Sequence, residues 1–215
     1  MSVVDLFTPR DSSTGFSLLT VCTGNICRSP LAELYLRRGL ADLDDVAVSS
    51  AGTMAVDDDV MPDQARALAR SFDLEPDAHR ARFLFGRDVR SADLALALAR
   101  EHRRAVVAMH PRASRYTFTL REAARLAHDV SDDEIAEAMP GTGASTAERL
   151  RAAVGLLASR RGTVPAADDP IDDDVVDPYR RSDETFVESG RQLVPAADVL
   201  VDLLRRAAAS PGRVR

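Results

Sequence analysis

Residues 16–37 read FSLLTVCTGNICRSPLAELYLR, and three kinds of local structure follow one another in this stretch. An apolar run of high strand propensity, residues 16–21, leads into Cys22. Ser29 and Pro30 then open a segment in which apolar residues recur at helical spacing, beginning at Leu31. The stretch therefore predicts a strand, a tight loop and a helix, in that order.

A loop between a strand and the N-terminus of a helix suits a phosphate-sized anion. Unpaired backbone N–H groups gather there at the positive end of the helix dipole. Gly24 and Asn25 can adopt left-handed backbone angles, and Pro30 fits the first helical turn, where no N–H is needed. We therefore expect this loop to bind a tetrahedral oxyanion.

Cys22 and Arg28 give the loop a chemical function. The helix dipole and the Arg28 guanidinium both favour the thiolate form of Cys22, which is a nucleophile. The planar fork of Arg28 can bind two phosphoryl oxygens. A nucleotide-binding loop would instead need Gly-Lys-Ser/Thr, but the chain has no lysine, and a dinucleotide fold would need Gly-x-Gly-x-x-Gly. The pattern indicates phosphoryl transfer.

The run Cys-Thr-Gly-Asn-Ile-Cys-Arg-Ser-Pro, followed by Ala-Glu, resembles the low-molecular-weight protein tyrosine phosphatases. The resemblance implies hydrolysis of phosphotyrosine through a phosphocysteine on Cys22, with Arg28 binding the phosphate and with no cofactor or metal. It also implies that Ser29 stabilises the thiolate. The predicted substrate-binding residues of the loop are Thr23, Gly24, Asn25, Ile26, Cys27 and Ser29. A buried cysteine beside a capping serine is the structural alternative.

Expelling a phenolate near neutral pH calls for a proton donor, because a phenol has a pKa of ~10. Asp177-Pro178-Tyr179 resembles the family's Asp-Pro-aromatic loop, so we predict that Asp177 is the general acid and then the base. Tyr179 would stack on the substrate ring. Asp169-Pro170 repeats the dipeptide without an aromatic residue and is a weaker candidate. The aspartates between the two dipeptides are expected to form a solvated acidic loop.

Two further residues have a supporting role by resemblance. Residues 50–53, Ser-Ala-Gly-Thr, match a turn that the family places beside the phosphate loop, which assigns Ser50. His79 lies in a His-x-x-Arg pattern whose imidazole faces the loop asparagine in the family. In isolation His79 would be interpreted as a surface or capping residue. His102 and His110 show no metal-ligand spacing and are expected to be structural.

Strand and helix patterns alternate along the chain, which predicts an α/β fold of three layers, α/β/α, with a central four-stranded parallel sheet. Further strands are expected at residues 46–49, 92–99 and 105–109. Capping patterns predict helices beginning near residues 119, 131 and 145. The last helix is expected to break or bend at Gly190 and Pro195.

The chain is expected to form one domain. Residues 1–15 contain many helix and strand breakers, which predicts a flexible arm. We expect residues 16–207 to form the phosphatase domain and residues 208–215 to form a tail. The resemblance lapses over about 130–170, which predicts an inserted helical region, expected to be a flap near the cleft. Its role, like the oligomeric state, is left open by the sequence.

Composition excludes some classes of binding partner. A net charge of −6 argues against nucleic acid, and no apolar run approaches the ~20 residues that span a bilayer. Cys22 and Cys27 are too close in sequence to staple a secreted fold. We therefore expect a cytoplasmic protein, similar to bacterial members of the family, that acts on phosphotyrosine in proteins and binds neither nucleic acid nor membrane.

Several alternatives remain open. Ile26 is usual in the tyrosine-directed branch of the family, whereas its arginine-phosphate-specific branch carries Thr there, so a protein arginine phosphatase is the nearest rival. An arsenate reductase would need resolving cysteines after Cys27, and none follows. A non-catalytic phosphopeptide-binding module is a third possibility. Cys22 and Cys27 could also form a reversible protective disulfide, or Cys27 could be a small buried thiol.

Overall fold

The computed structural model describes residues 15–211; the predicted arm at 1–14 and residues 212–215 of the predicted tail lie outside them. Four strands form one sheet in the order β2-β1-β3-β4, and every neighbouring pair is parallel. The strands are β1 (Phe16–Cys22), β2 (Val46–Gly52), β3 (Leu94–Ala97) and β4 (Thr117–Thr119). The four-stranded parallel sheet is therefore confirmed.

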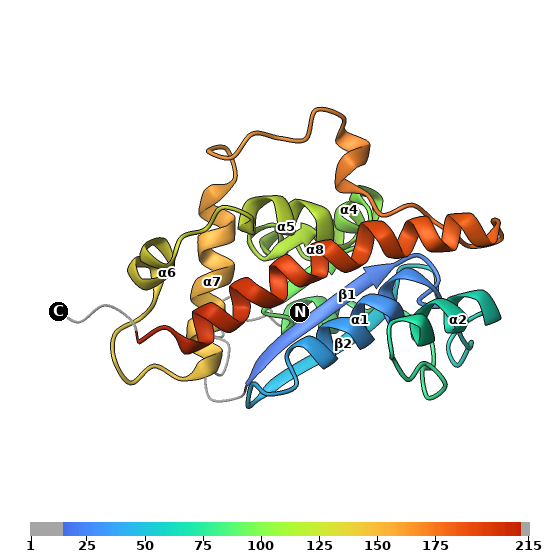
Figure 1. The fold of residues 1–215 in the computed structure, drawn as a ribbon, viewed down its shortest axis with the longest axis horizontal. Coiled ribbons are helices and arrows are strands. Elements are labelled where there is room, and N and C mark those ends of the chain that lie inside the picture. Colours follow the sequence, from blue (N-terminus) through green and yellow to red (C-terminus); the bar gives the residue numbers. More distant parts are fainter. Residues whose placement is uncertain (1–14, 212–215) are drawn as a thin grey trace, which may run out of the picture.

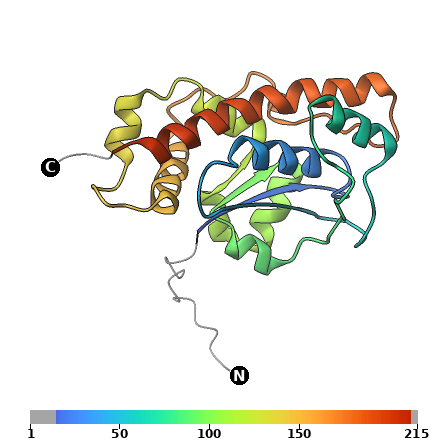
Figure 2. The ribbon, with the colours of Figure 1, turned by 60° about the horizontal axis from the view of Figure 1, so that its bottom comes forward.

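Helices cover both faces of the sheet (Figure 2). On one face lie α1 (Arg28–Gly39) and the long α8 (Asp183–Ala209), and on the other lie α3 (Gly86–Ser91) and α4 (Arg100–Met109). The remaining α-helices are α2 (Asp63–Ser71), α5 (Leu120–Ala127), α6 (Asp132–Ala138) and α7 (Thr146–Arg160). Two short 3-10 helices, η1 (Pro111–Arg115) and η2 (Pro170–Asp173), complete the elements.

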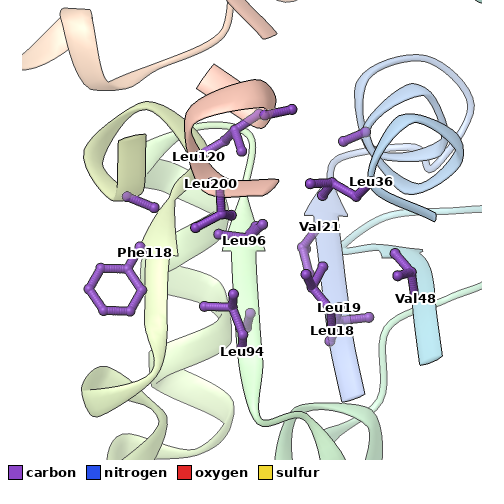
Figure 3. Close-up of a cluster of buried hydrophobic side chains, with 14 of the residues drawn as sticks. Leu18, Leu19, Val21, Leu36, Val48, Leu94, Leu96, Phe118, Leu120 and Leu200 are labelled. Atoms are coloured by element: carbon purple, nitrogen blue, oxygen red, sulfur yellow. The ribbon is translucent and has the colours of Figure 1, made fainter. Parts of the chain in front are cut away.

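The core lies between the sheet and its helices. Figure 3 shows Leu200 of α8 reaching down beside Leu96 of β3, while Leu36 of α1 covers the β1 side. All three side chains are fully buried. Close packing of this kind holds the strand ends, and so the loops that leave them, in fixed positions.

The prediction of a fourth strand at residues 105–109 was wrong, because these residues form the second half of α4. The run AVVAM is apolar enough for a buried strand, but only Val106 in it is buried, and Met109 is exposed. One buried residue per turn is a helical pattern. The fourth strand is instead the three-residue β4, and β3 is shorter than the predicted 92–99.

The capping patterns located three helices correctly. Thr119, Ser131 and Ser145 each accept a hydrogen bond from the backbone N–H three residues later. The glutamate at that third position bonds back to the N–H of the capping residue. These reciprocal pairs satisfy two otherwise unpaired donors at each helix start, which explains why a local pattern sufficed.

The inserted helices do not form a flap near the cleft. Helices α6 and α7 pack beside the C-terminal half of α8 (Figure 1). They lie at the end of the sheet where the strands begin, away from the carboxyl ends of the strands. Arg151 of α7 bonds the buried Asp93 at 2.9 Å, and Asp93 accepts a hydrogen bond from Ser17 N at 3.0 Å. Leu150 and Leu157 are fully buried. Because α7 contributes to the core, the segment is an integral part of the domain.

Helix α8 runs through Gly190 and Pro195 as one element, so of the predicted break or bend the break does not occur. A Cβ on Gly190 would lie 3.2 Å from a methyl of Leu68 and 3.3 Å from the ring of Phe72. Gly190 therefore allows α2 to approach α8 closely. The helix also continues to Ala209, two residues into the predicted tail. Within residues 15–211, none of the helices has the length and apolarity that a membrane span requires.

Candidate active site

The predicted loop connects β1 to α1 at the carboxyl ends of the strands. Cys22 is the last residue of β1 and Arg28 is the first of α1. Asn25 has a φ of 53°, so it adopts the left-handed conformation that was expected of it. Gly24 does not, because the positive-φ glycines of the described residues are Gly143 and Gly162. A single left-handed residue is therefore sufficient to turn the loop.

Ser29 lies against the sulfur of Cys22. The Ser29 hydroxyl oxygen is 2.9 Å from Cys22 Sγ, and both side chains are buried. Asn25 Nδ2 donates to the same hydroxyl at 2.9 Å and to Ser50 Oγ at 2.7 Å. Because the Ser29 oxygen already accepts from Asn25, its hydrogen is free to point at the sulfur. This arrangement can stabilise a negative charge on Cys22.

Asn25 is held from behind by residues of α1, of β2 and of the connection between α2 and α3. His79 Nε2 is 2.7 Å from Asn25 O, and a carbonyl only accepts, so Nε2 carries the hydrogen. The Ser50 hydroxyl donates to Glu33, and Arg82 N donates to Asn25 Oδ1 at 2.9 Å. Glu33 had not been assigned a role, although it lies within the resembling run. Its position on the side of α1 that faces β2 is the feature that could have indicated a role for Glu33.

Residues 52–54 complete the rear wall of the loop. Thr53 N donates to Cys22 O and Met54 N donates to Thr23 O, each at 2.9 Å. A Cβ on Gly52 would lie 2.5 Å from Thr23 O and 2.8 Å from Asn25 N. A glycine is therefore required here by the close approach of two backbone segments.

The predicted acid reaches the same place from the far end of the chain. Asp177 Oδ2 is 2.8 Å from Arg28 Nη2, and Arg28 Nη1 donates to Val175 O at 3.1 Å. Tyr179 N donates to Asp177 Oδ1 at 3.1 Å, which orients the carboxylate. Asp169, the weaker candidate, caps the start of η2 with its own carboxylate and does not line the cleft.

The solvated acidic loop expected before Asp177 is confirmed only in part, because two of its aspartates are paired with arginines while the others are exposed. Asp174 accepts from the backbone N–H of Arg100 at 2.7 Å and from its guanidinium at 3.1–3.2 Å. Asp173 pairs with Arg125 at 3.1 Å. The sequence could not reveal the arginine partners of these aspartates, because the arginines lie on α4 and α5, far away along the chain. These pairs fix the segment that leads to Asp177.

Cys22, Arg28 and Asp177 meet in one cleft of about 270 Å³. Its other lining residues are Thr23, Gly24, Ile26, Cys27, Met54, Val56, Asp59 and Tyr179. Met54, Val56 and Asp59, which follow the 50–53 turn, were not predicted from the sequence. The two apolar ones are 74% and 65% exposed, so they form the rim rather than the floor. No local motif marks such rim residues.

Two titratable groups beside the cleft are held neutral. Burial, together with the Cys22 and Asp177 charges, raises the pKa of the Cys27 thiol to about 12. Burial and the nearby Arg28 lower the pKa of His102 to about 3. His102, expected to be merely structural, contacts the phosphate loop: its Nε2 is 2.8 Å from Thr23 Oγ1. Within residues 15–211, no three His, Cys, Asp or Glu side chains gather closely enough to hold a metal ion.

A sequence model described as low molecular weight phosphotyrosine protein phosphatase matches residues 17–141. The chain belongs to this family. Among its phosphatase relatives is the probable low molecular weight protein-tyrosine-phosphatase EpsP of Ralstonia solanacearum, 36% identical over 106 residues, or 49% of this chain and 71% of EpsP. Etp of Escherichia coli K12, a low molecular weight protein-tyrosine-phosphatase, is 38% identical over 44% of this chain and 62% of its own length.

The phosphatase fold extends beyond the matched sequence. The solved structure of YwlE arginine phosphatase from Geobacillus stearothermophilus superposes with a TM-score of 0.61 at 24% identity, covering 88% of this chain and 93% of that one. The three-layer architecture is therefore that of known low molecular weight phosphatases. The matched sequence stops at residue 141, whereas the loop that carries the predicted acid lies beyond residue 170.

Proposed function

We propose that this family member is a protein-tyrosine phosphatase that works through a phosphocysteine on Cys22. The thiolate attacks phosphorus, and an S–P bond forms as the bond between phosphorus and the aryl oxygen breaks. The electron pair leaves with that oxygen, which takes a proton from Asp177. Water then attacks phosphorus, Asp177 accepts the proton, and the S–P bond breaks to release inorganic phosphate and the thiolate.

One observation carries this proposal: two groups from one loop and a third from a distant part of the chain, all of complementary chemistry, line one cleft. Cys22 ends β1, Arg28 begins α1, and Asp177 follows η2. The Arg28 guanidinium is 4% exposed and fixed by Val175, so it is preorganised to stabilise charge on the phosphoryl oxygens. The backbone N–H groups of the loop at the N-terminus of α1 add to this stabilisation.

The rim of the cleft favours an aryl phosphate. Ile26, Met54, Val56 and Tyr179 present apolar surface around the entrance. A phenyl ring gains from contact with such groups, and an aromatic wall can stack on it. The neutral, buried Cys27 completes the inner wall and carries no charge that would repel a phosphate. A phosphotyrosine side chain of a protein therefore fits better than an alkyl phosphate.

Asp59 supports a second candidate, a protein arginine phosphatase. Its carboxylate lines the same cleft and could pair with the guanidinium of phosphoarginine. Peptides that carry phosphotyrosine or phosphoarginine at one position separate the two functions by the ratio of kcat/KM. We expect a preference for phosphotyrosine that shrinks when Ile26 is replaced by Thr, since Thr is typical of the arginine-directed branch.

The decisive experiment is phosphate release from an aryl phosphate by wild type and three variants. Cys22→Ser is expected to abolish release. Asp177→Asn is expected to lower kcat by roughly 100-fold or more, the usual contribution of a general acid. Asp169→Asn is the matched control, because it removes the carboxylate of the other Asp-Pro dipeptide outside the cleft. Equal losses in the two Asn variants, or release by Cys22→Ser, would contradict the mechanism.

The cellular setting stays a prediction. A cytoplasmic location in a bacterium, a phosphoprotein substrate and the absence of nucleic-acid and membrane partners follow from the sequence arguments above. For Cys27 the two alternatives, a reversible disulfide with Cys22 and a small buried thiol, both stand; both cysteines are free and buried in this structure. Mass spectrometry of the peroxide-treated protein would detect that bond directly.

A further inference from the structure

His102 lies in the first turn of α4, directly behind the phosphate loop. Its side chain is 2% exposed, and its Nε2 is 2.8 Å from Thr23 Oγ1, one residue after the nucleophile. Its other ring nitrogen, Nδ1, is buried and has no hydrogen-bond partner among the described residues. A buried polar group that is only half satisfied is unusual and costs stability, so its placement invites an explanation.

The surroundings of the ring decide which nitrogen carries the hydrogen. Nε2 faces two oxygens, Thr23 Oγ1 and, at 3.4 Å, the carboxylate of Glu101, which can only accept. A bare Nε2 would set its lone pair against that carboxylate and would leave a buried N–H at Nδ1 without an acceptor. The hydrogen therefore belongs on Nε2, and His102 donates to Thr23.

This direction fixes what the Thr23 hydroxyl can do. Its oxygen accepts from His102, so its own hydrogen needs an acceptor elsewhere. Within residues 15–211, His102 is the only side chain with which that hydroxyl forms a hydrogen bond. Thr23 is half-buried and lines the cleft beside Cys22 and Arg28. The one acceptor that the proposed reaction brings to this position is the phosphoryl group.

We propose that the Thr23 hydroxyl donates a hydrogen bond to the phosphoryl group of the substrate, and that His102 is the positioning residue that turns it toward the cleft. This inference deepens the proposed function and rests on it. A neutral imidazole suits the task because it adds no charge that would compete with Arg28 for the phosphate. The groups that face the ring are Arg28, Glu101 and Asp174, with Arg28 opposing its protonation.

The first test determines which ring nitrogen of His102 carries the hydrogen. Nitrogen-15 NMR of the intact protein distinguishes protonated from bare ring nitrogens, and His102→Gln identifies the signal. We expect protonated Nε2 and bare Nδ1, unchanged from about pH 5 to 9, since the pKa of His102 lies near 3. A hydrogen on Nδ1, or titration near pH 6.5, would overturn the proposal.

The second test measures the dissociation constant of inorganic phosphate. Thr23→Val and His102→Leu should each weaken binding about tenfold or more, as expected for a hydrogen bond to a charged group. The double variant should bind no more weakly than either single one, because both remove the same interaction. Thr23→Ser keeps the hydroxyl and should bind phosphate as wild type does. His102→Gln keeps an N–H donor and should retain part of the affinity. The control is His128→Gln, which changes an exposed histidine on the surface.

A purely structural role for His102 gives a different pattern. In that case His102→Leu would weaken phosphate binding further in the Thr23→Val background, and the proposal would be wrong. If His102→Leu does not fold, the NMR assignment and the Thr23→Val and His102→Gln affinities still decide. Failure of wild type to hydrolyse an aryl phosphate would instead contradict the proposed function, while phosphate affinity and the tautomer still test the hydrogen bond.

Discussion

At the scale of single residues, the phosphate loop depends on contacts to its backbone as much as on its side chains. Asn25 is left-handed, and its carbonyl, side-chain oxygen and side-chain nitrogen are all engaged. The buried Ser29 receives one of these bonds and passes its own hydrogen toward Cys22. The nucleophile is therefore oriented by a chain of neutral hydrogen bonds behind it.

Gly52→Ala should lower the rate of catalysis strongly without unfolding the protein. The new methyl would lie 2.5 Å from Thr23 O and 2.8 Å from Asn25 N, so the loop must move. Displacements of this kind at a catalytic group cost on the order of 100-fold in rate. The measurement is kcat/KM for an aryl phosphate, together with the thermal unfolding midpoint.

Gly141→Ala is the control for that substitution, because no atom lies within 4 Å of the position of its Cβ. It should leave kcat/KM unchanged. If Gly52→Ala retained full activity, the contact of residues 52–54 with the phosphate loop would not matter for catalysis.

Residues that share a short motif could be predicted, and residues joined only by the fold could not. The loop, the left-handed Asn25 and the predicted acid Asp177 each sit in a recognisable local pattern; the structure brings Cys22, Arg28 and Asp177 to one cleft and buries Asn25 behind it. His102 and Glu33 act across elements, so no spacing in the sequence reveals their partners. The general rule that ligands lie at the carboxyl ends of parallel strands would have drawn attention to His102, which follows β3 closely.

At the scale of elements, α7 is a structural helix rather than an accessory. It buries Leu150 and Leu157, and Arg151 joins it to Asp93 before β3 and to Gly15 O before β1. Removing residues 131–167 would expose this part of the core. The insertion was predicted because the resemblance to the family stops there, and that observation carries no information about packing. The apolar side chains of α7 indicated that one face is buried, but they do not reveal which surface that face covers.

Arg151→Ala should lower the free energy of unfolding by about 3 kcal/mol, because it removes the guanidinium that pairs with the buried Asp93 carboxylate at 2.9 Å. Denaturant unfolding would measure this loss, and aryl phosphatase activity should persist because α7 lies away from the cleft. Arg205→Ala is the matched control: its pair with Asp42 is exposed and should contribute less than about 1 kcal/mol. Equal effects of the two substitutions would contradict the anchoring role of Arg151.

At the scale of the whole molecule, His102 makes stability depend on pH. Its pKa falls from 6.5 in a free side chain to about 3 in the fold, through burial and the charge of Arg28. Between these values the unfolded chain binds a proton that the folded chain does not. Stability contributed by the neutral ring is therefore present above about pH 6.5 and is lost as the pH falls.

The loss should reach about 2 kcal/mol at about pH 5, relative to neutral pH. The measurement is the free energy of unfolding of wild type and His102→Gln at both pH values. Ion-paired carboxylates add an acid sensitivity that both proteins share, so the informative quantity is the difference between the two slopes. Parallel slopes would show that His102 titrates equally in the folded and unfolded states.

The pairs that fasten the chain before Asp177 have one more consequence. Arg161 is tied to Thr117 O and Glu122, and Arg125 is tied to both Pro165 O and Asp173, so the stretch 166–170 lies between two fixed points. It arches past α5 toward α4 (Figure 1). The entropy of closing a loop grows only slowly with its length. Added sequence there would lengthen the arch without displacing the acid, which makes this stretch a natural point for grafting a tag or a foreign domain.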